Sequence, residues 1–217
     1  MLSQTERIKI AKRVVKELSD GEVVNLGVGI PTLIPDYLGD KKVYLQSENG
    51  LLGMGPTPDK ENINMDLISA SKKPITMNIG ASLFDSSDSF AMIRGGHVDM
   101  AVLGALQVDQ HGEIANWAVP GKTILGVGGA MDLVAGARRI VIASMHLAKD
   151  GQPKLVKELT LPSSGVRKAD LLVTEHAVFR FTDRGTELIE ILSDMSVDEL
   201  RKITGVEFKY SEEKIIT

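Results

Sequence analysis

The chain repeatedly places a short apolar segment directly before a glycine-rich turn. Val23–Leu26 runs into Gly27-Val28-Gly29-Ile30-Pro31, and Met100–Leu103 runs into Gly104. Short, continuously apolar segments of this kind are typical of strands that are buried on both faces of a parallel sheet. The turns that follow such strands meet at the carboxyl edge of the sheet, where binding crevices form. The chain is therefore predicted to be an α/β protein.

Predicted helices alternate with these strands. Residues 5–18 carry apolar side chains at helical spacing and end at Asp20-Gly21, which predicts an amphipathic helix. Further strands are expected at 43–46, 75–78, 100–103, 140–143 and 171–174. Further helices are expected at 33–38, 86–94, 129–135, 188–192 and 197–204. Since the sequence shows no repeat or linker, residues 1–217 are predicted to form one domain, a single open, mostly parallel sheet with flanking helices.

Composition excludes several classes of function. A net charge of -4 gives no electrostatic reason to bind nucleic acid or an anionic membrane. The absence of cysteine excludes disulfides and zinc–thiolate sites, and the four histidines lack paired metal-ligand spacing, so no metal is expected. The sequence has neither a signal-peptide pattern nor an apolar stretch long enough to span a membrane, which predicts a cytoplasmic protein.

Glu48 is the first candidate for chemistry. It follows the predicted strand 43–46 and precedes Asn49-Gly50 and the apolar run 51–56, which is expected to be flexible. Asn-Gly is a common turn dipeptide, so a solvated turn carboxylate is one interpretation. The apolar surroundings favour a partly desolvated carboxylate instead, which can act as a covalent nucleophile without a separate base. The residues alone leave both interpretations open.

A second glycine-rich run, Gly126-Val127-Gly128-Gly129, precedes a predicted helix. Glycines let a backbone approach a ligand and leave amide N–H groups free at a helix start, where they can hold a phosphate or the oxygen of a tetrahedral intermediate. The alternative is an ordinary tight turn, because the run matches neither the P-loop nor the dinucleotide-binding fingerprint. The turn at 27–31, which contains Val28, admits the same two interpretations.

The order and the residues of the motifs, taken together, are more specific than any single motif. The series consists of 25–32 (NLGVGIPT), 46–50 (QSENG), 89–99 (SFAMIRGGHVD), 115–117 (ANW), 120–122 (PGK) and 128–134 (GGAMDLV). This series resembles the beta (B) subunit of 3-oxoacid CoA-transferases over roughly residues 7 to 208. The resemblance implies the CoA-transferase fold, which is related to the folds of ribose-5-phosphate isomerase and glucosamine-6-phosphate deaminase.

The resemblance also implies a ping-pong reaction in which coenzyme A is substrate and covalent intermediate, with no permanently bound cofactor. Glu48 matches the catalytic glutamate of the family and would form an acyl-glutamyl anhydride and then a glutamyl-CoA thioester. Gly128, Gly129 and Val28 are expected to stabilise the oxyanion or to bind CoA. Asn49 is likewise expected to stabilise the oxyanion or to bind CoA, and Asn116 is expected to orient the glutamate or the substrate.

A separate alpha (A) subunit is expected to supply the other half of the site, in an alpha2beta2 assembly. The acids exchanged are expected to include acetoacetate, with a succinyl, acetyl or butyryl donor. Two departures from the family are visible: Val127 stands where Met is common, and Met145 stands where many relatives have Glu. Whatever role that acid has in the family is therefore not carried over.

Two other functions stay open. A sugar-phosphate isomerase-like enzyme on a related fold would bind phosphate and need no CoA, and the Ser-Glu-Asn-Gly context disfavours it. If the chain is instead a non-catalytic partner that binds CoA or stabilises another subunit, replacement of Glu48 by Ala would leave turnover of the assembled complex unchanged.

Overall fold

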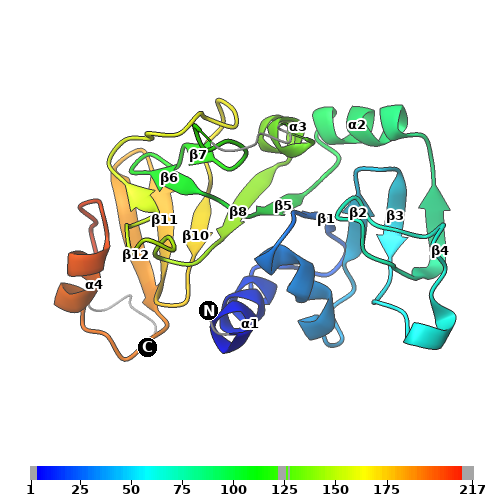
Figure 1. The fold of residues 1–217 in the computed structure, drawn as a ribbon, viewed down its shortest axis with the longest axis horizontal. Helices are drawn as coiled ribbons and strands as arrows, with labels where there is room; N and C mark the ends of the chain where they lie inside the picture. The colour runs from blue at the N-terminus through cyan, green and yellow to red at the C-terminus, as the bar shows by residue number, and fades with distance from the viewer. Residues whose placement is uncertain (1–3, 122–125, 127, 212–217) are drawn as a thin grey trace.

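A nine-stranded sheet organises the computed structural model, which describes residues 4–121, 126 and 128–211. From one edge to the other its strands are β12 (Gly185–Ile191), β11 (Ala177–Thr182), β10 (Leu171–Val173), β8 (Arg139–Ala143), β5 (Met100–Leu103), β1 (Val23–Leu26), β2 (Tyr44–Ser47), β3 (Leu51–Met54) and β4 (Met77–Leu83). Figure 1 shows β4 at one end of the molecule and β12, beside α4, at the other. A small second sheet contains β7 (Ile114–Ala115), β6 (Gln107–Asp109) and β9 (Leu155–Val156).

The five central strands, β10, β8, β5, β1 and β2, are parallel to one another. The outer pairs β2–β3, β3–β4, β10–β11 and β11–β12 are antiparallel, so only β3 and β11 run against the other seven strands of this sheet. The prediction of an α/β fold with a mostly parallel sheet is thus confirmed. All five central strands match predicted segments, because they are the ones buried on both faces.

Two hydrophobic cores lie on opposite faces of the sheet. The helix α1 (Gln4–Val15) and the 3-10 helix η1 (Ile30–Tyr37) cover one face and pack on Met100 and Val102. The helices α2 (Ser86–Arg94), α3 (Ala130–Gly136) and α4 (Val197–Ile203), together with the small sheet, cover the other face. Alternate residues of β5 supply the two cores, as the pleat of a strand requires. A short 3-10 helix, η2 (Lys60–Asn62), lies between β3 and β4.

Two predicted elements are wrong. The segment 188–192 was expected to be a helix, but it lies in β12, where Thr186, Leu188 and Glu190 are buried at every second position. The buried carboxylate of Glu190 hides this alternation from a hydrophobicity pattern, because it is buried through an ion pair with Arg13. The helix expected at 33–38 is instead the 3-10 helix η1, in which Pro31 and Pro35 cannot donate backbone hydrogen bonds.

The apolar run after Glu48 was expected to be flexible, but most of it forms a strand. Leu51–Met54 forms β3, which pairs with β2 on one side and β4 on the other. The strand expected at 75–78 overlaps β4 only at residues 77 and 78, because β4 runs from Met77 to Leu83. None of the helices in the described residues is both long and apolar enough to cross a membrane.

Candidate active site

Glu48 lies in the tight turn that joins β2 to β3. Ser47 and Leu51 pair across this hairpin, and Gly50 closes the turn with a φ of 117°. A β-carbon at Gly50 would lie 2.1 Å from the carbonyl oxygen of Phe84, so this position requires glycine both for its backbone angle and for its space. The turn predicted from Asn49-Gly50 is confirmed, and it holds the half-buried Glu48 side chain in a defined place.

A chain of buried amides holds the Glu48 carboxylate. Asn25 Nδ2 donates to Glu48 Oε2 at 3.2 Å and to Gln46 Oε1 at 2.6 Å, and Gln46 Nε2 donates to Ser89 Oγ at 2.7 Å. Asn25 and Gln46 are 1% and 2% exposed, and Ser89 is fully buried. Buried polar groups of this kind are costly unless they are paired, so the chain fixes its members in one arrangement. The carboxylate therefore has a preferred orientation.

Sequence reasoning missed this chain of amides. Asn25 and Gln46 are the polar residues inside two apolar strands, and the parallel register of β1 and β2 places them opposite each other. A buried polar residue within an apolar strand is a detectable signal, but the pairing depends on a register that the sequence does not display. The Oδ1 atom of Asn25 is buried and has no hydrogen-bond partner among the described residues.

The second glycine run approaches the same carboxylate. A β-carbon at Gly129 would lie 3.3 Å from Glu48 Cγ and 3.3 Å from the ring of Phe90, so glycine allows this close packing. Gly128 has a φ of 58°, and Gly129 precedes the first turn of α3. The structure thus brings together Glu48 and the Gly128–Gly129 turn, which lie far apart in the sequence. Val127, the departure noted above, lies outside the described residues.

Glu48 also lines a small pocket, with a volume of about 50 Å³. Val28 forms part of its wall and is 73% exposed. Apolar side chains such as Leu26 and Met54 line it together with the cation Lys73, whose Nζ lies 3.2 Å from Thr32 Oγ1. The carboxylate therefore faces a space that combines apolar walls with charges of both signs, since Asp36 lines it as well as Lys73.

Two candidate residues have other partners in this structure. Asn49 Nδ2 donates to the carbonyl oxygen of Ile68 at 2.8 Å, so it ties the turn to the connection between β3 and β4. Asn116 accepts a hydrogen bond from Ser164 Oγ at its Oδ1 and donates one to Ser164 Oγ from its backbone N–H. Neither residue hydrogen-bonds to Glu48 within the described part of the chain. Met145, which replaces the common Glu of the family, is buried in the core.

The buried histidine His146 lies away from this site. Its ring nitrogens lie 3.2 Å from Thr174 Oγ1 and 3.0 Å from Thr204 Oγ1. Burial, followed by the charge of His176, lowers the pKa of His146 to about 4. Residues 4–121, 126 and 128–211 contain no cluster of three or more histidine or acidic side chains suited to a metal ion.

A family model described as coenzyme A transferase matches residues 7–202, and the chain belongs to that family. The chain is 46% identical to the B subunit of the succinyl-CoA:3-ketoacid coenzyme A transferase of Helicobacter pylori, over 94% of this chain and 98% of the relative. It is 48% identical to the B subunit of the 3-oxoadipate CoA-transferase of Pseudomonas putida, over 94% of this chain and 95% of the relative. These relatives are therefore B subunits of CoA-transferases.

A solved structure extends the similarity to the fold. An acyl-CoA transferase of Escherichia coli O157:H7, solved as a thioester complex with CoA, matches with a TM-score of 0.74 at 23% identity. The match covers all of this chain but 44% of the other, so the present chain spans less than half the length of that enzyme. The predicted CoA-transferase fold is thereby confirmed.

Proposed function

We propose that this chain is the catalytic B subunit of a 3-oxoacid CoA-transferase, with Glu48 as its covalent nucleophile. The observation that carries the proposal is the Glu48 carboxylate itself, which is oriented by Asn25, packed against Gly129 and open to a pocket. An ionised carboxylate so held is ready to attack a carbonyl carbon. The identity of 46% and 48% to B subunits of CoA-transferases supports the same assignment.

The proposed reaction starts with an acyl-CoA. A carboxylate oxygen of Glu48 attacks the thioester carbonyl carbon, the carbon–sulfur bond breaks, and the CoA thiolate leaves an acyl-glutamyl anhydride behind. The thiolate then attacks the glutamyl carbonyl carbon and displaces the first acid as a carboxylate, which leaves a glutamyl-CoA thioester. A second acid, such as acetoacetate, reverses these steps and departs as its CoA ester. No net proton is taken up, so no separate base is required.

The residues around Glu48 have distinct proposed tasks. Asn25 orients the carboxylate, Gln46 holds Asn25, and Ser89 in turn holds Gln46. Backbone N–H groups of Gly128 and Gly129 are proposed to stabilise the negative oxygen that develops on the attacked carbonyl. The apolar walls of the pocket limit the access of water to the anhydride and the thioester, both of which hydrolyse.

The remaining site residues are assigned more broadly. Val28, on the exposed rim of the pocket, is proposed to contact CoA. Asn49 and Asn116 stay predicted contributors to CoA binding and orientation, and in this role each would exchange its present partner for a substrate. Coenzyme A is a substrate in this scheme and becomes covalently bound only during the cycle.

The proposed enzyme also contains a partner. An A subunit would complete the site, in an alpha2beta2 complex, and residues 1–217 would contribute one domain to it. The names of the relatives, which are B subunits, support the existence of such a partner.

A transfer assay on the reconstituted complex tests the proposal. Glu48→Gln keeps the size of the side chain and one acceptor oxygen for Asn25 but removes the nucleophilic charge. It should lower transfer of CoA from succinyl-CoA or acetyl-CoA to acetoacetate by roughly four orders of magnitude or more. Glu158→Gln, a change at an exposed glutamate, is the matched control and should leave transfer unchanged. Full activity of the Glu48→Gln complex would refute the role of Glu48.

A further inference from the structure

The two edge strands of the large sheet differ in whether their outer side has hydrogen-bond partners. At one edge the chain itself covers β12: the N–H of Leu188 donates to the carbonyl oxygen of Lys209, and the N–H of Lys209 donates to that of Thr186. At the other edge, no described residue pairs with the outer side of β4. Open strand edges invite pairing with another chain, and proteins usually protect them with charges, prolines or a covering segment.

The β4 edge has apolar side chains where protection would be expected. Ile79 is fully exposed, Leu83 is 63% exposed, and every residue of β4 except the half-buried Ala81 is exposed. The β4 surface is defined here as the exposed apolar side chains of β4 and of the connection before it: Ile63, Met65, Ile68, Met77, Ile79 and Leu83. These are six of the eleven large apolar side chains that are exposed in the described residues. A concentration of this kind marks an interaction site.

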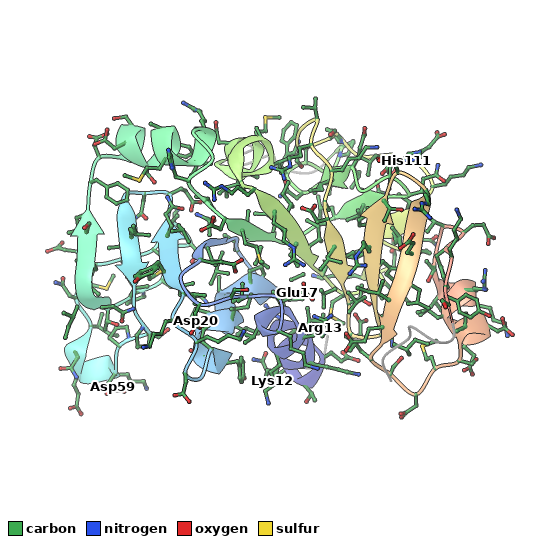
Figure 2. All side chains as sticks on the ribbon, turned by 180° about the vertical axis from the view of Figure 1, so that it is seen from behind. Lys12, Arg13, Glu17, Asp20, Asp59 and His111 are labelled. Carbon is green, nitrogen blue, oxygen red and sulfur yellow. The ribbon has the colours of Figure 1, made fainter. Side chains whose placement is uncertain are left out.

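The β4 surface is joined directly to the Glu48 turn. The N–H of Phe84, just beyond β4, donates to the carbonyl oxygen of Gly50 at 3.0 Å. The connection is fixed to the same turn, because Asn49 Nδ2 donates to the carbonyl oxygen of Ile68 and the N–H of Ala70 donates to Ser47 Oγ. Figure 1 shows β4 beside β3 and β2 at the end of the sheet, and Figure 2 shows Asp59, on the connection, at its outer corner. A protein bound here would therefore lie beside the Glu48 pocket.

We propose that the β4 surface is the docking site of the A subunit, an inference that rests on the proposed function. The occupant should present an apolar face, since the surface itself is apolar and lies at an unpaired strand edge. Two observations favour the A subunit over a second copy of this chain. More than half of the E. coli enzyme lies outside the part that this chain matches, so the fold is used there together with further chain. In addition, the Glu48 pocket opens beside this surface, where a partner could supply the missing part of the site.

Two lysine substitutions test the proposal. Ile79→Lys with Leu83→Lys places charges on the β4 surface at positions that are already in water, so the isolated chain should keep its unfolding midpoint to within about 2 °C. Its dissociation constant for the purified A subunit, measured by calorimetry or sedimentation, should rise at least about 30-fold. Val166→Lys is the matched control, since Val166 is also apolar and exposed but lies outside the surface. This control should bind the A subunit like the unchanged chain.

A second readout locates the contact without any substitution. On addition of the A subunit, the amides of β4 should become protected from hydrogen exchange, whereas those of β12 should be unchanged. Unaltered affinity of the double lysine variant, or unaltered exchange in β4, would overturn the proposal. So would a chain that self-associates through this surface while it still binds the A subunit normally.

The outcome is separable from that of the proposed function. The double lysine variant retains Glu48, so its transfer rate should recover when the A subunit is added at concentrations above the raised dissociation constant. Glu48→Gln should show the opposite behaviour, with normal assembly and no transfer. A failed docking proposal would thus leave the nucleophile assignment untouched, and the reverse also holds.

Discussion

The two ends of the nine-stranded sheet differ in how their edge strands are covered. The β12 end is closed: its edge strand is covered by the segment around Lys209, and α4 packs against it. The β4 end is open and apolar, and it carries the Glu48 turn, which only a glycine at position 50 can close. The proposed chemistry therefore lies at the open end, whereas the closed end is expected to contribute mainly to stability. Substitutions at one end should therefore leave the property of the other unchanged.

An ion network near the β12 end shows how the closed half is held. Arg13 on α1 donates to Glu190 of β12 at 2.5 Å and to Glu17 at 2.7 Å, and Glu17 also accepts from Arg139 of β8. Figure 2 labels Arg13 and Glu17 at the end of α1 that lies against the sheet. Burial alone would lower the pKa of Arg13, but the hydrogen bonds to Glu17 and Glu190 outweigh it and raise that pKa. The network links α1 to two strands.

The largest effect on stability is expected from this network. Arg13→Ala removes the partner of the buried Glu190 carboxylate and one of the two partners of the half-buried Glu17, which should reduce the free energy of unfolding by roughly 3–5 kcal/mol. Urea denaturation measures this change, and Lys9→Ala, at an exposed position on the same helix, is the control. Affinity for the A subunit, measured below the unfolding transition, should stay the same. Loss of that affinity in folded protein would contradict the separation of the two ends.

The next largest expected effect is a loss of catalytic rate from a substitution at the open end. Asn25→Ala removes the donor to the Glu48 carboxylate and should lower kcat roughly 10- to 100-fold, while KM changes much less, because the carboxylate loses its orientation. Steady-state kinetics on the assembled complex separates the two constants. Ser89→Ala removes only the far end of the chain of amides and should have a smaller effect in the same direction. Equal losses for every variant would indicate misfolding rather than positioning.

The smallest expected effect is a loss of stability at low pH, caused by a histidine at the closed end. The pKa of His146 is about 4 in the folded chain, below its unfolded value of 6.5, so the unfolded state binds the proton more readily between these values. Stability should therefore fall as the pH drops from 6.5 towards 4. His146 should account for about 2 kcal/mol of the loss between about pH 7 and pH 5. Denaturation of the unchanged chain and of His146→Gln at both pH values tests this, and an identical loss in both would refute it.

The sequence predicted the centre of the fold better than its ends. The five parallel strands are largely apolar, so each was visible as a separate segment, and the turn at Glu48 was visible from Asn49-Gly50. The antiparallel additions β3, β11 and β12 were not predicted as strands. In β12, burial of Glu190 depends on Arg13, which is 177 residues away in the sequence. A local pattern cannot show such a partner.

The candidate site was predicted in outline. Glu48 packs against Gly129 and shares a pocket with Val28, so the structure places both glycine-rich turns near this carboxylate. The sequence did not reveal Asn25 and Gln46 as partners of the carboxylate, because their contact depends on the register of β1 against β2. Nor did it reveal that Asn116 is held by Ser164, a contact between two loops. Motifs therefore located the proposed reacting group, and tertiary structure alone located the groups that orient it.

The most direct test of the account is to look for the covalent intermediate. The complex of both subunits should be mixed with acetoacetyl-CoA, quenched within seconds, digested and examined by mass spectrometry. If Glu48 is the nucleophile, a CoA adduct should appear on the peptide that contains Glu48 and should be absent from the Glu48→Gln complex. A complex that transfers CoA at its full rate but never carries an adduct on that peptide would contradict the account.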